Sequence, residues 1–142
     1  MTTHRYCTFH VAGLLVGIEV SQVLEVVRGL DPTQVPLAHP SVLGLLNLRG
    51  QIVTAIDARC RLHLAAAPGS DRVNVIIRSG DELMSLVVDR AGDVLDLDAA
   101  TREEVPETIS PTIRSFVSGA YQLESALLLI LDTDSALSPS AA

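Results

Sequence analysis

The sequence predicts an all-β fold built from two copies of one small five-stranded unit. Short runs rich in Val, Ile and Leu recur between turn residues, and few stretches keep helical spacing for more than two turns. The second half of the chain also repeats the first. Gly44 precedes Asp57 by 13 positions, and Gly119 precedes Asp132 by the same 13. A unit of about 60 residues is near the lower size limit for a core of its own, so we expect the two copies to be fused.

Ten segments are expected to be strands, five in each half of the chain. Gly13, Gly50 and Gly80 fall between successive strands, and glycine reaches the positive φ angles that tight hairpin turns require. Five short strands favour a small closed barrel, because closure removes exposed edges. We therefore expect two small barrels packed together. The ten segments are residues 6–11, 15–20, 24–28, 45–48, 52–56, 73–78, 83–88, 94–97, 117–122 and 127–131.

The connections differ between the two halves. Pro32, Pro36 and Pro40 restrict the link between the third and fourth strands to an extended path, with a short helical turn expected from Ser41. The corresponding segment of the second half, residues 101–115, has a more helical pattern. The second copy therefore has the longer and more helical connection.

The division of the chain follows from the same pattern. One domain is expected over residues 1–142, made of two barrel subdomains at about 14–70 and 80–137. Whether terminal strands are exchanged between these subdomains stays open. Residues 65–71 are the candidate linker, and residues 138–142 have the composition of a flexible tail.

Composition limits the class of protein. The chain has 142 residues, of which 48% are hydrophobic, enough for a packed core. Its longest uninterrupted apolar run, residues 126–131, is far shorter than the roughly 18 to 20 residues of a membrane-spanning helix, so we do not expect an integral membrane protein. Cys7 and Cys60 lack the spacing of a metal site or a disulfide framework. We expect small buried thiols in a reducing compartment, the cytoplasm.

The charge of the chain argues against nucleic acid as a partner. The formal net charge of -7 is divided into +1 over residues 1–70 and -8 over residues 71–142. Phosphate binding requires a basic face, and aromatic residues, at 3%, offer little surface for stacking on bases. Most of the acidic side chains are expected to form a solvated surface that aids solubility.

The sequence contains no recognisable set of catalytic residues. No nucleophile motif or phosphate-binding loop is present, the chain has no lysine, and its four histidines show no metal-ligand spacing. Carboxylates do occur close together, as Glu103 with Glu104 and Asp96 with Asp98, but in polar connections where solvated side chains are usual. We expect neither an enzyme nor a metal or cofactor site, so we consider a binding protein.

Arg49 is the strongest candidate for a binding residue. It lies at the expected tip of a hairpin between apolar strands, and a rigid guanidinium is a common anchor at interfaces. Glu25 lies in an apolar run and could pair with Arg49, face the same partner, or be an ordinary outward strand residue. An ordinary solvated turn residue is the alternative for Arg49. Asp57 and Asp132, each after an apolar strand, are expected to cap turns.

At these residues the chain resembles the CheW-like family, adaptors that couple chemoreceptors to the histidine kinase CheA. The similarity runs nearly end to end, and its most specific part is Asn-Leu-Arg-Gly at 47–50. It implies two intertwined five-stranded SH3-like barrels with short helical connections, no catalysis and no cofactor. The matching segments are Val-Leu-Glu-Val at 23–26, Val-Pro at 35–36, Gly-Leu-Leu-Asn-Leu-Arg-Gly-Gln-Ile-Val at 44–53, Asp57, Val-Val-Asp at 87–89, Gly119 and Leu-Asp at 131–132.

The resemblance also implies roles for individual residues. Arg49, Glu25 and Val23 would contact the coiled-coil tip of the receptor's cytoplasmic region. The regulatory domain of a CheA-like kinase, itself CheW-like, would be the second partner, and the residues that contact it are unknown. The protein would be cytoplasmic and recruited through its partners to membrane receptor arrays. The residues that would form the motif and its turn are Gly44, Asn47, Leu48 and Gly50.

Departures from the family pattern leave alternatives open. Ala58 stands where leucine is common, Ser85 where glycine is usual, and Ala91 where valine is usual. A divergent member could serve pilus or gliding control instead of flagellar chemotaxis. It could also be a barrel that senses a small ligand or a peptide, for which the apolar hairpin at residues 14–16 is a further motive. A ligand-binding cavity would favour that alternative, and solid core packing would count against it.

Overall fold

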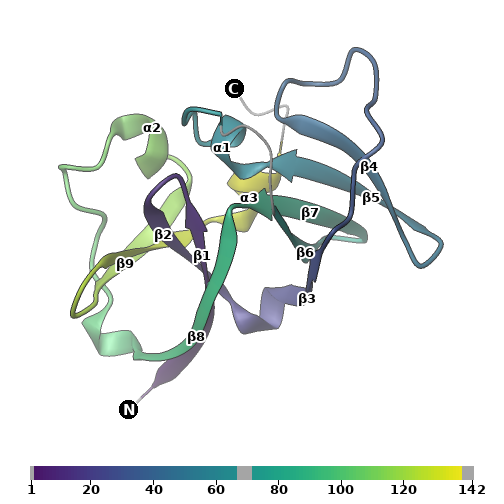
Figure 1. The fold of residues 1–142 in the computed structure, drawn as a ribbon. Helices are drawn as coiled ribbons and strands as arrows, with labels where there is room; N and C mark the ends of the chain where they lie inside the picture. The colour runs from purple at the N-terminus through teal and green to yellow at the C-terminus, as the bar shows by residue number, and fades with distance from the viewer. Residues whose placement is uncertain (1, 67–71, 139–142) are drawn as a thin grey trace.

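The computed structural model describes residues 2–66 and 72–138, and its described part is mostly β-structure (Figure 1). Every segment expected to be a strand is a strand, with ends shifted by at most four residues. No helix in these residues is long and apolar enough to cross a membrane. The elements in chain order are β1 (Thr3–Val11), β2 (Leu14–Glu19), η1 (Val20–Gln22), β3 (Val23–Arg28), β4 (Val42–Leu48), β5 (Gln51–Asp57), α1 (Ala58–Arg61), β6 (Val73–Ser79), β7 (Glu82–Val88), β8 (Arg90–Asp98), η2 (Ala99–Thr101), α2 (Pro111–Arg114), β9 (Val117–Gln122), β10 (Leu127–Leu131) and α3 (Thr133–Leu137).

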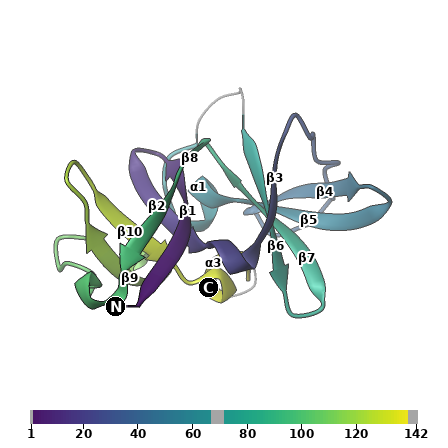
Figure 2. The ribbon, with the colours of Figure 1, turned by 90° about the horizontal axis from the view of Figure 1, so that it is seen from below.

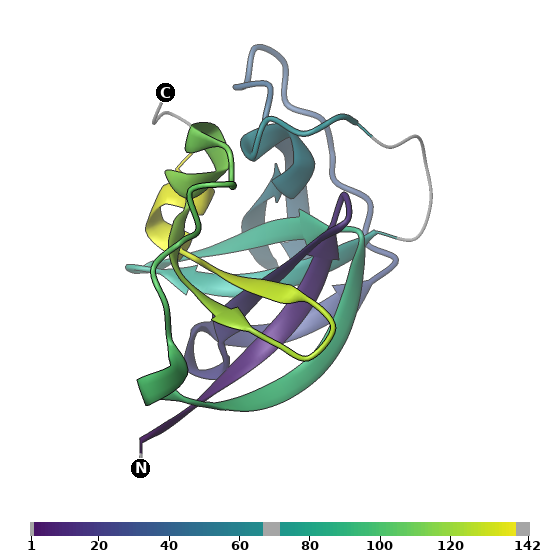
Figure 3. The same ribbon diagram turned by 90° about the vertical axis from the view of Figure 1, so that its left-hand side faces the viewer.

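The strands form two five-stranded sheets that lie side by side (Figure 2). Sheet A has the order β8-β1-β2-β10-β9, and sheet B has the order β3-β6-β7-β5-β4. In Figure 3 the purple N-terminal hairpin of sheet A lies between the green strand β8 and the yellow-green hairpin β9–β10. Exchanging each strand for its counterpart five strands away converts one order into the other. The sequence repeat is therefore a repeat of topology, with strands from both halves in each sheet.

This exchange matters for the expected subdomains. The division at residues 14–70 and 80–137 was drawn along the chain, whereas sheet A combines β1 and β2 with β8, β9 and β10. Sheet B takes β3, β4 and β5 from the first half and β6 and β7 from the second. Neither sheet can be completed by one half of the chain alone.

Closed barrels are not confirmed, because both sheets are open. Each leaves two edge strands, β8 and β9 in sheet A and β3 and β4 in sheet B. In sheet B a single bridge spans the gap: Thr33 N donates to Leu45 O at 2.8 Å, and Leu45 N donates to Thr33 O at 2.9 Å. In sheet A the bridge between Glu103 and Ala120 has the same two bonds, at 2.8 and 2.9 Å. One residue pair takes the place of a continuous ladder.

Gly44 makes the bridge of sheet B possible. It is buried beside a β-bulge in β4, has a φ of 151°, and lies directly against the backbone of Thr33. A Cβ at this position would lie 2.6 Å from the carbonyl carbon of Thr33 and closer still to its oxygen. The repeated glycine therefore reflects close backbone approach as well as its φ angle.

Three apolar clusters result from this arrangement. Alternate side chains of β10 separate cleanly: Leu129 and Leu131 join the large cluster between the sheets, while Leu128 and Ile130 join the inner face of sheet A. In β7, Leu86 faces the central cluster and Val87 faces the inner cluster of sheet B. Strands buried on both faces lack alternation of polar and apolar residues, which accounts for the apolar runs of the sequence.

The hairpin turns are as expected. Gly13, Gly50 and Gly80 have φ angles of 85°, 86° and 61° and occupy the turns of β1–β2, β4–β5 and β6–β7. In the first two turns a non-glycine residue with positive φ precedes the glycine. Positive φ at both central residues defines the type I′ turn, whose twist matches that of the strands.

The helical turn expected from Ser41 is wrong. Strand β4 begins at Val42, and the carbonyl of the buried Ser41 accepts a hydrogen bond from Asp57 N at 2.8 Å. This bond extends the pairing of β4 with β5 and leaves no carbonyl for a helix. In the counterpart connection the helical expectation is met only by the short elements η2 and α2.

The two predicted capping carboxylates behave differently. Asp57 caps α1, because its Oδ1 accepts a hydrogen bond from Arg59 N at 3.0 Å. Asp132 precedes α3 but caps no backbone N–H; its Oδ2 accepts a hydrogen bond from Ser135 Oγ at 3.2 Å. Capping is therefore confirmed for the first aspartate and wrong for the second. The predicted linker and tail lie outside the described residues at positions 67–71 and 139–142.

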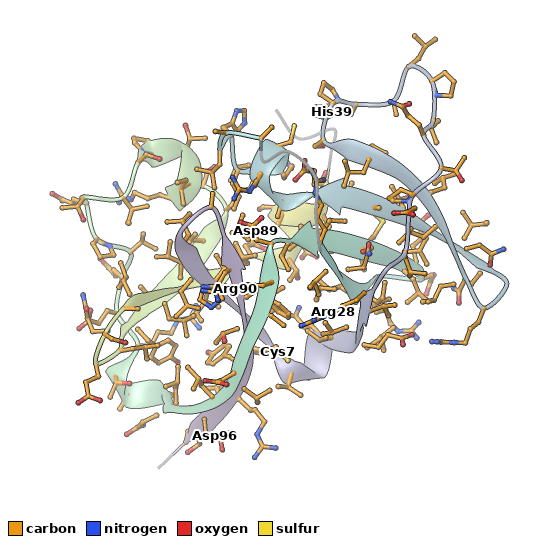
Figure 4. The ribbon with its side chains drawn as sticks, in the orientation of Figure 1. Cys7, Arg28, His39, Asp89, Arg90 and Asp96 are labelled. Carbon is orange, nitrogen blue, oxygen red and sulfur yellow. The ribbon has the colours of Figure 1, made fainter. Side chains whose placement is uncertain are left out.

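An aspartate after β7 connects the two sheets. The Asp89 carboxylate accepts bonds from Arg59 Nε at 2.9 Å, Arg59 Nη2 at 2.6 Å and Ala12 N at 2.8 Å. Arg59 lies on α1, which follows sheet B, and Ala12 lies in the β1–β2 turn of sheet A. Hydrogen bonding to Arg59 holds the pKa of Asp89 below its ordinary value. Figure 4 shows Asp89 at this junction.

Asp89→Asn is expected to lower the free energy of unfolding at pH 7 by about 1–3 kcal/mol, the range for hydrogen bonds to a charged group. Because the folded-state pKa is depressed, the contribution is complete above the ordinary value of 3.8 and is lost as pH falls through the folded value. Urea denaturation from pH 7 to pH 2 should therefore show wild type and variant converging in acid. Asp96→Asn is the matched control, since Asp96 also pairs with an arginine, Arg5, but both side chains are more than half exposed. An equal effect of the two variants would contradict a special role for Asp89.

Gly44→Ala is expected to destabilise the fold by more than about 2 kcal/mol, because the new Cβ would push Thr33 away and break the bridge to Leu45. Gly29→Ala is the control: its φ is also positive, at 77°, but a Cβ there has no neighbour within 4 Å, so only a backbone cost of about 1–2 kcal/mol remains. Thermal unfolding followed by circular dichroism measures both. Equal losses would show that contact with Thr33 is unimportant.

Candidate binding site

The turn between β4 and β5 presents Arg49. Leu48 pairs with Gln51, so Arg49 and Gly50 form a two-residue loop with φ angles of 50° and 86°. Asn47 Oδ1 accepts a hydrogen bond from Gly50 N at 2.8 Å, which closes the turn. Leu48 is buried in the inner cluster of sheet B. Asn47, Leu48 and Gly50 are thus structural residues that hold the backbone beneath the Arg49 side chain.

Arg49 pairs with Glu25 on β3. The contact is bidentate: Nη2 is bonded to Oε1, and Nη1 donates to Oε2 at 3.4 Å. Hydrogen bonding to Glu25, with its charge as the second cause, raises the pKa of Arg49 above its ordinary value. Of the possibilities left open for Glu25, the structure therefore shows the pair with Arg49.

The Arg49–Glu25 pair spans the gap in sheet B. β3 and β4 are the two edges of this sheet, and Thr33 bridges to Leu45 further along the same gap. The Arg49 side chain is 72% exposed and that of Glu25 is 31% exposed. An ion pair this exposed contributes little to stability. Its main physical effect is to orient the guanidinium over β3, with three of its five N–H donors free of Glu25.

Val23 lies on the same strand but in a different environment. It is half-buried against the central cluster, and a register shift between Val23 and Glu25 interrupts the pairing of β3 with β6. Its neighbours Leu24 and Val26 are 48% and 43% exposed. The structure therefore places Val23 near Glu25 in the chain but buries much of its side chain, while Leu24 and Val26 offer the apolar surface.

Sequence reasoning missed these exposed side chains and a second exposed pair. Leu45 and Ile52 lie on the outer face of the β4–β5 hairpin, Ile52 with 61% of its surface exposed. The available signal was position: β3 is an edge strand, and β4 and β5 continue into an exposed turn. Which face of such a strand is covered depends on neighbours that are distant in the sequence.

The described residues contain no group of three or more His, Cys, Asp or Glu side chains placed to hold a metal ion. Cys7 and Cys60 are free thiols, and both are half-buried, less buried than the sequence predicted. Among the described residues, the chemistry that this surface offers is hydrogen bonding by Arg49, the charge of Glu25, and apolar contact on both sides of the gap.

Known proteins share this sequence and fold. The Chemotaxis protein CheW of Bacillus subtilis is 30% identical over 137 residues, which cover 96% of this chain and 88% of that protein. The Chemotaxis protein CheW of Rhizobium meliloti is 31% identical over 111 residues, covering 77% and 72%. The crystal structure of the scaffolding protein TtCheW from Thermoanaerobacter tengcongensis matches with a TM-score of 0.84 and 25% identity, over 92% of this chain and 90% of that chain.

The family comparison agrees with the fold and with the motif at the β4–β5 turn. The model of the CheW-like domain matches residues 5–140, nearly all of the chain. Ten strands in two interlocked sheets, the Asn-Leu-Arg-Gly turn and the named relatives point to the same assignment. The chain belongs to the CheW-like domain family.

Proposed function

We propose that this protein is a non-enzymatic adaptor that couples chemoreceptors to a CheA-type histidine kinase. The observation that carries the proposal is the Arg49 guanidinium, held at a rigid turn and oriented by Glu25. Relatives named as chemotaxis and scaffolding proteins support it. The protein would act in the cytoplasm and reach receptor arrays at the membrane through its partners. Each sheet with its bridge would correspond to one SH3-like barrel of the family.

The receptor-binding surface would consist of Arg49, Glu25 and the exposed edge of β3 that includes Val23. A coiled-coil tip presents helices with apolar stripes flanked by charged side chains. Leu24 and Val26 offer apolar area to such a helix, and the free donors of Arg49 offer hydrogen bonds to its carboxylates or carbonyl groups. A small apolar area beside one rigid arginine is typical of an interface hot spot.

The kinase would bind elsewhere on the chain, through its own CheW-like regulatory domain. The outer face of the β4–β5 hairpin is our candidate, because Leu45 and Ile52 are exposed there without a charged side chain between them. Exposed apolar pairs of this kind commonly mark surfaces for protein partners. Two separate weak contacts would suit an array, in which several contacts act together.

The same adaptor role would serve flagellar chemotaxis, pilus control or gliding control. What differs among these pathways is the identity of the receptor and the kinase, and the two surfaces described above fit all three. The alternative of a ligand-sensing protein gains one observation, a cavity at the opposite end of sheet B from Arg49. That cavity is treated below as an addition to the adaptor role.

Arg49→Glu is expected to weaken binding to a receptor signalling tip at least tenfold, because it removes the guanidinium and places a second carboxylate beside Glu25. The fold should stay intact, since the side chain is exposed, and binding to the kinase regulatory domain should be unchanged. Biolayer interferometry against each partner, with circular dichroism of the variant, measures all three.

The double variant Glu25→Arg with Arg49→Glu separates the two roles of Arg49. It restores an ion pair across the gap but reverses the charges that a partner meets. If Arg49 contacts the receptor, binding stays weak in the double variant. Full recovery of receptor affinity would instead show that the pair only orients β3 and the turn.

Ile52→Asp is expected to weaken binding to the kinase regulatory domain at least tenfold, because a charge would be buried in an apolar contact. Receptor binding should be unchanged. Val94→Asp is the matched control, since Val94 is similarly exposed, at 58%, but lies on β8 of sheet A. Isothermal titration calorimetry would contradict the assignment if Val94→Asp, and not Ile52→Asp, lost the kinase.

A further inference from the structure

Sheet B has a cavity at the end opposite to Arg49. Its volume is about 780 Å³, larger than two other surface pockets of about 480 and 490 Å³. It lies between the chain segment that follows β3 and the start of β4, where Leu43 is one of its lining residues. Leu43 and Leu48 lie at opposite ends of β4, roughly 17 Å apart at the rise of an extended strand. The cavity is therefore separate from the proposed receptor surface.

The walls of the cavity are apolar and continue the inner core of sheet B. Leu30 and Leu43 pack against that core from its open end, and Val87 belongs to it. Ligand pockets in proteins commonly measure 300–1,000 Å³ and have apolar walls with a few placed polar groups. This cavity falls within that range.

A buried amide supplies the polar group inside. Asn74 lines the cavity with only 2% of its surface exposed. Its Oδ1 accepts a hydrogen bond from Ser85 Oγ at 2.8 Å, and Ser85 is completely buried. With the oxygen occupied, the group that Asn74 can offer to a ligand is its amide N–H. Ser85 stands at one of the positions where the sequence departs from the family pattern, so this polar pair is a specific feature of the chain.

The rim of the cavity carries more positive than negative charge. Arg28 lies at the end of β3 (Figure 4), and Arg72 directly precedes β6, next to the pair formed by Arg28 and Val73. Asp31 is the carboxylate on the same rim. Arg72 is also 3.7 Å from Asp57, through Nη1 and Oδ2. Two guanidinium groups and one rim carboxylate favour a ligand with a single negative charge.

We propose that this cavity binds a small monocarboxylate with an apolar body. The apolar body would lie against Leu30, Leu43 and Val87, and the carboxylate would bind Arg28 and Arg72 at the rim. A polar atom of the ligand could also accept the amide N–H of Asn74. The proposal does not depend on the adaptor function, because it uses none of the residues assigned to the receptor or the kinase.

The test is a titration of the ¹⁵N-labelled full chain with octanoate, followed by NMR, beside 1-octanol and octylamine. Octanoate should saturate with a Kd below about 1 mM and should shift the signals of Leu43, Asn74 and Val87. 1-Octanol should bind at least tenfold more weakly, because it lacks the charge, and octylamine should not bind the cavity. Shifts confined to Leu24, Val26 and Ile52 would mean adsorption to exposed apolar surface, which would overturn the proposal.

Variants make the result specific. Arg28→Gln should weaken octanoate binding at least tenfold without changing the fold, because Arg28 is exposed at the rim. Leu30→Trp should block the cavity by filling it. Arg90→Gln, which removes an exposed arginine on β8, should bind octanoate like the wild type. Equal loss in Arg28→Gln and Arg90→Gln, or no saturable binding at all, would overturn the proposal while leaving the receptor and kinase experiments unaffected.

Discussion

The structure depends on the apolar cluster between the two sheets, because neither sheet has enough residues to bury a full core alone. β10 and β7 supply this cluster with alternate side chains and direct the remaining ones into the inner clusters of their own sheets. Exchange of strands between the halves makes the arrangement cooperative: unfolding one half removes strands from both sheets. The adaptor surfaces are therefore carried on a framework that folds as one unit.

Open sheet edges follow from this design, and function is concentrated along one of them. Across the gap between β3 and β4, the protein places a backbone bridge at Thr33 and Leu45 and an exposed ion pair at Arg49 and Glu25. Gly44 lets the bridge form by permitting close approach of two backbones. The counterpart gap in sheet A has the equivalent bridge, and its hairpin has Glu124 at the position that corresponds to Arg49. The repeat thus preserves the structural device and varies the chemistry.

Charge has two distinct uses in this protein. Partly buried Asp89 joins α1 to the β1–β2 turn, and buried Arg61 lies 4.6 Å from the ring centroid of Phe116 and donates to Ser135 O at 3.0 Å. These groups hold elements of different sheets together. The exposed pair of Arg49 and Glu25 adds little stability, which leaves it available to a partner.

The sequence by itself determined the ten strands, the glycine turns, the cap at Asp57 and the motif around Arg49, because each depends on residues within a few positions of one another. Only the tertiary structure decided the exchange of strands, the open edges and the pairing of Arg49 with Glu25, which are 24 positions apart. It also decided that Ser41 continues the sheet, that Leu24 and Ile52 are exposed, and that a cavity lies beside Asn74. These features depend on which distant strands become neighbours, and local sequence patterns do not contain that information.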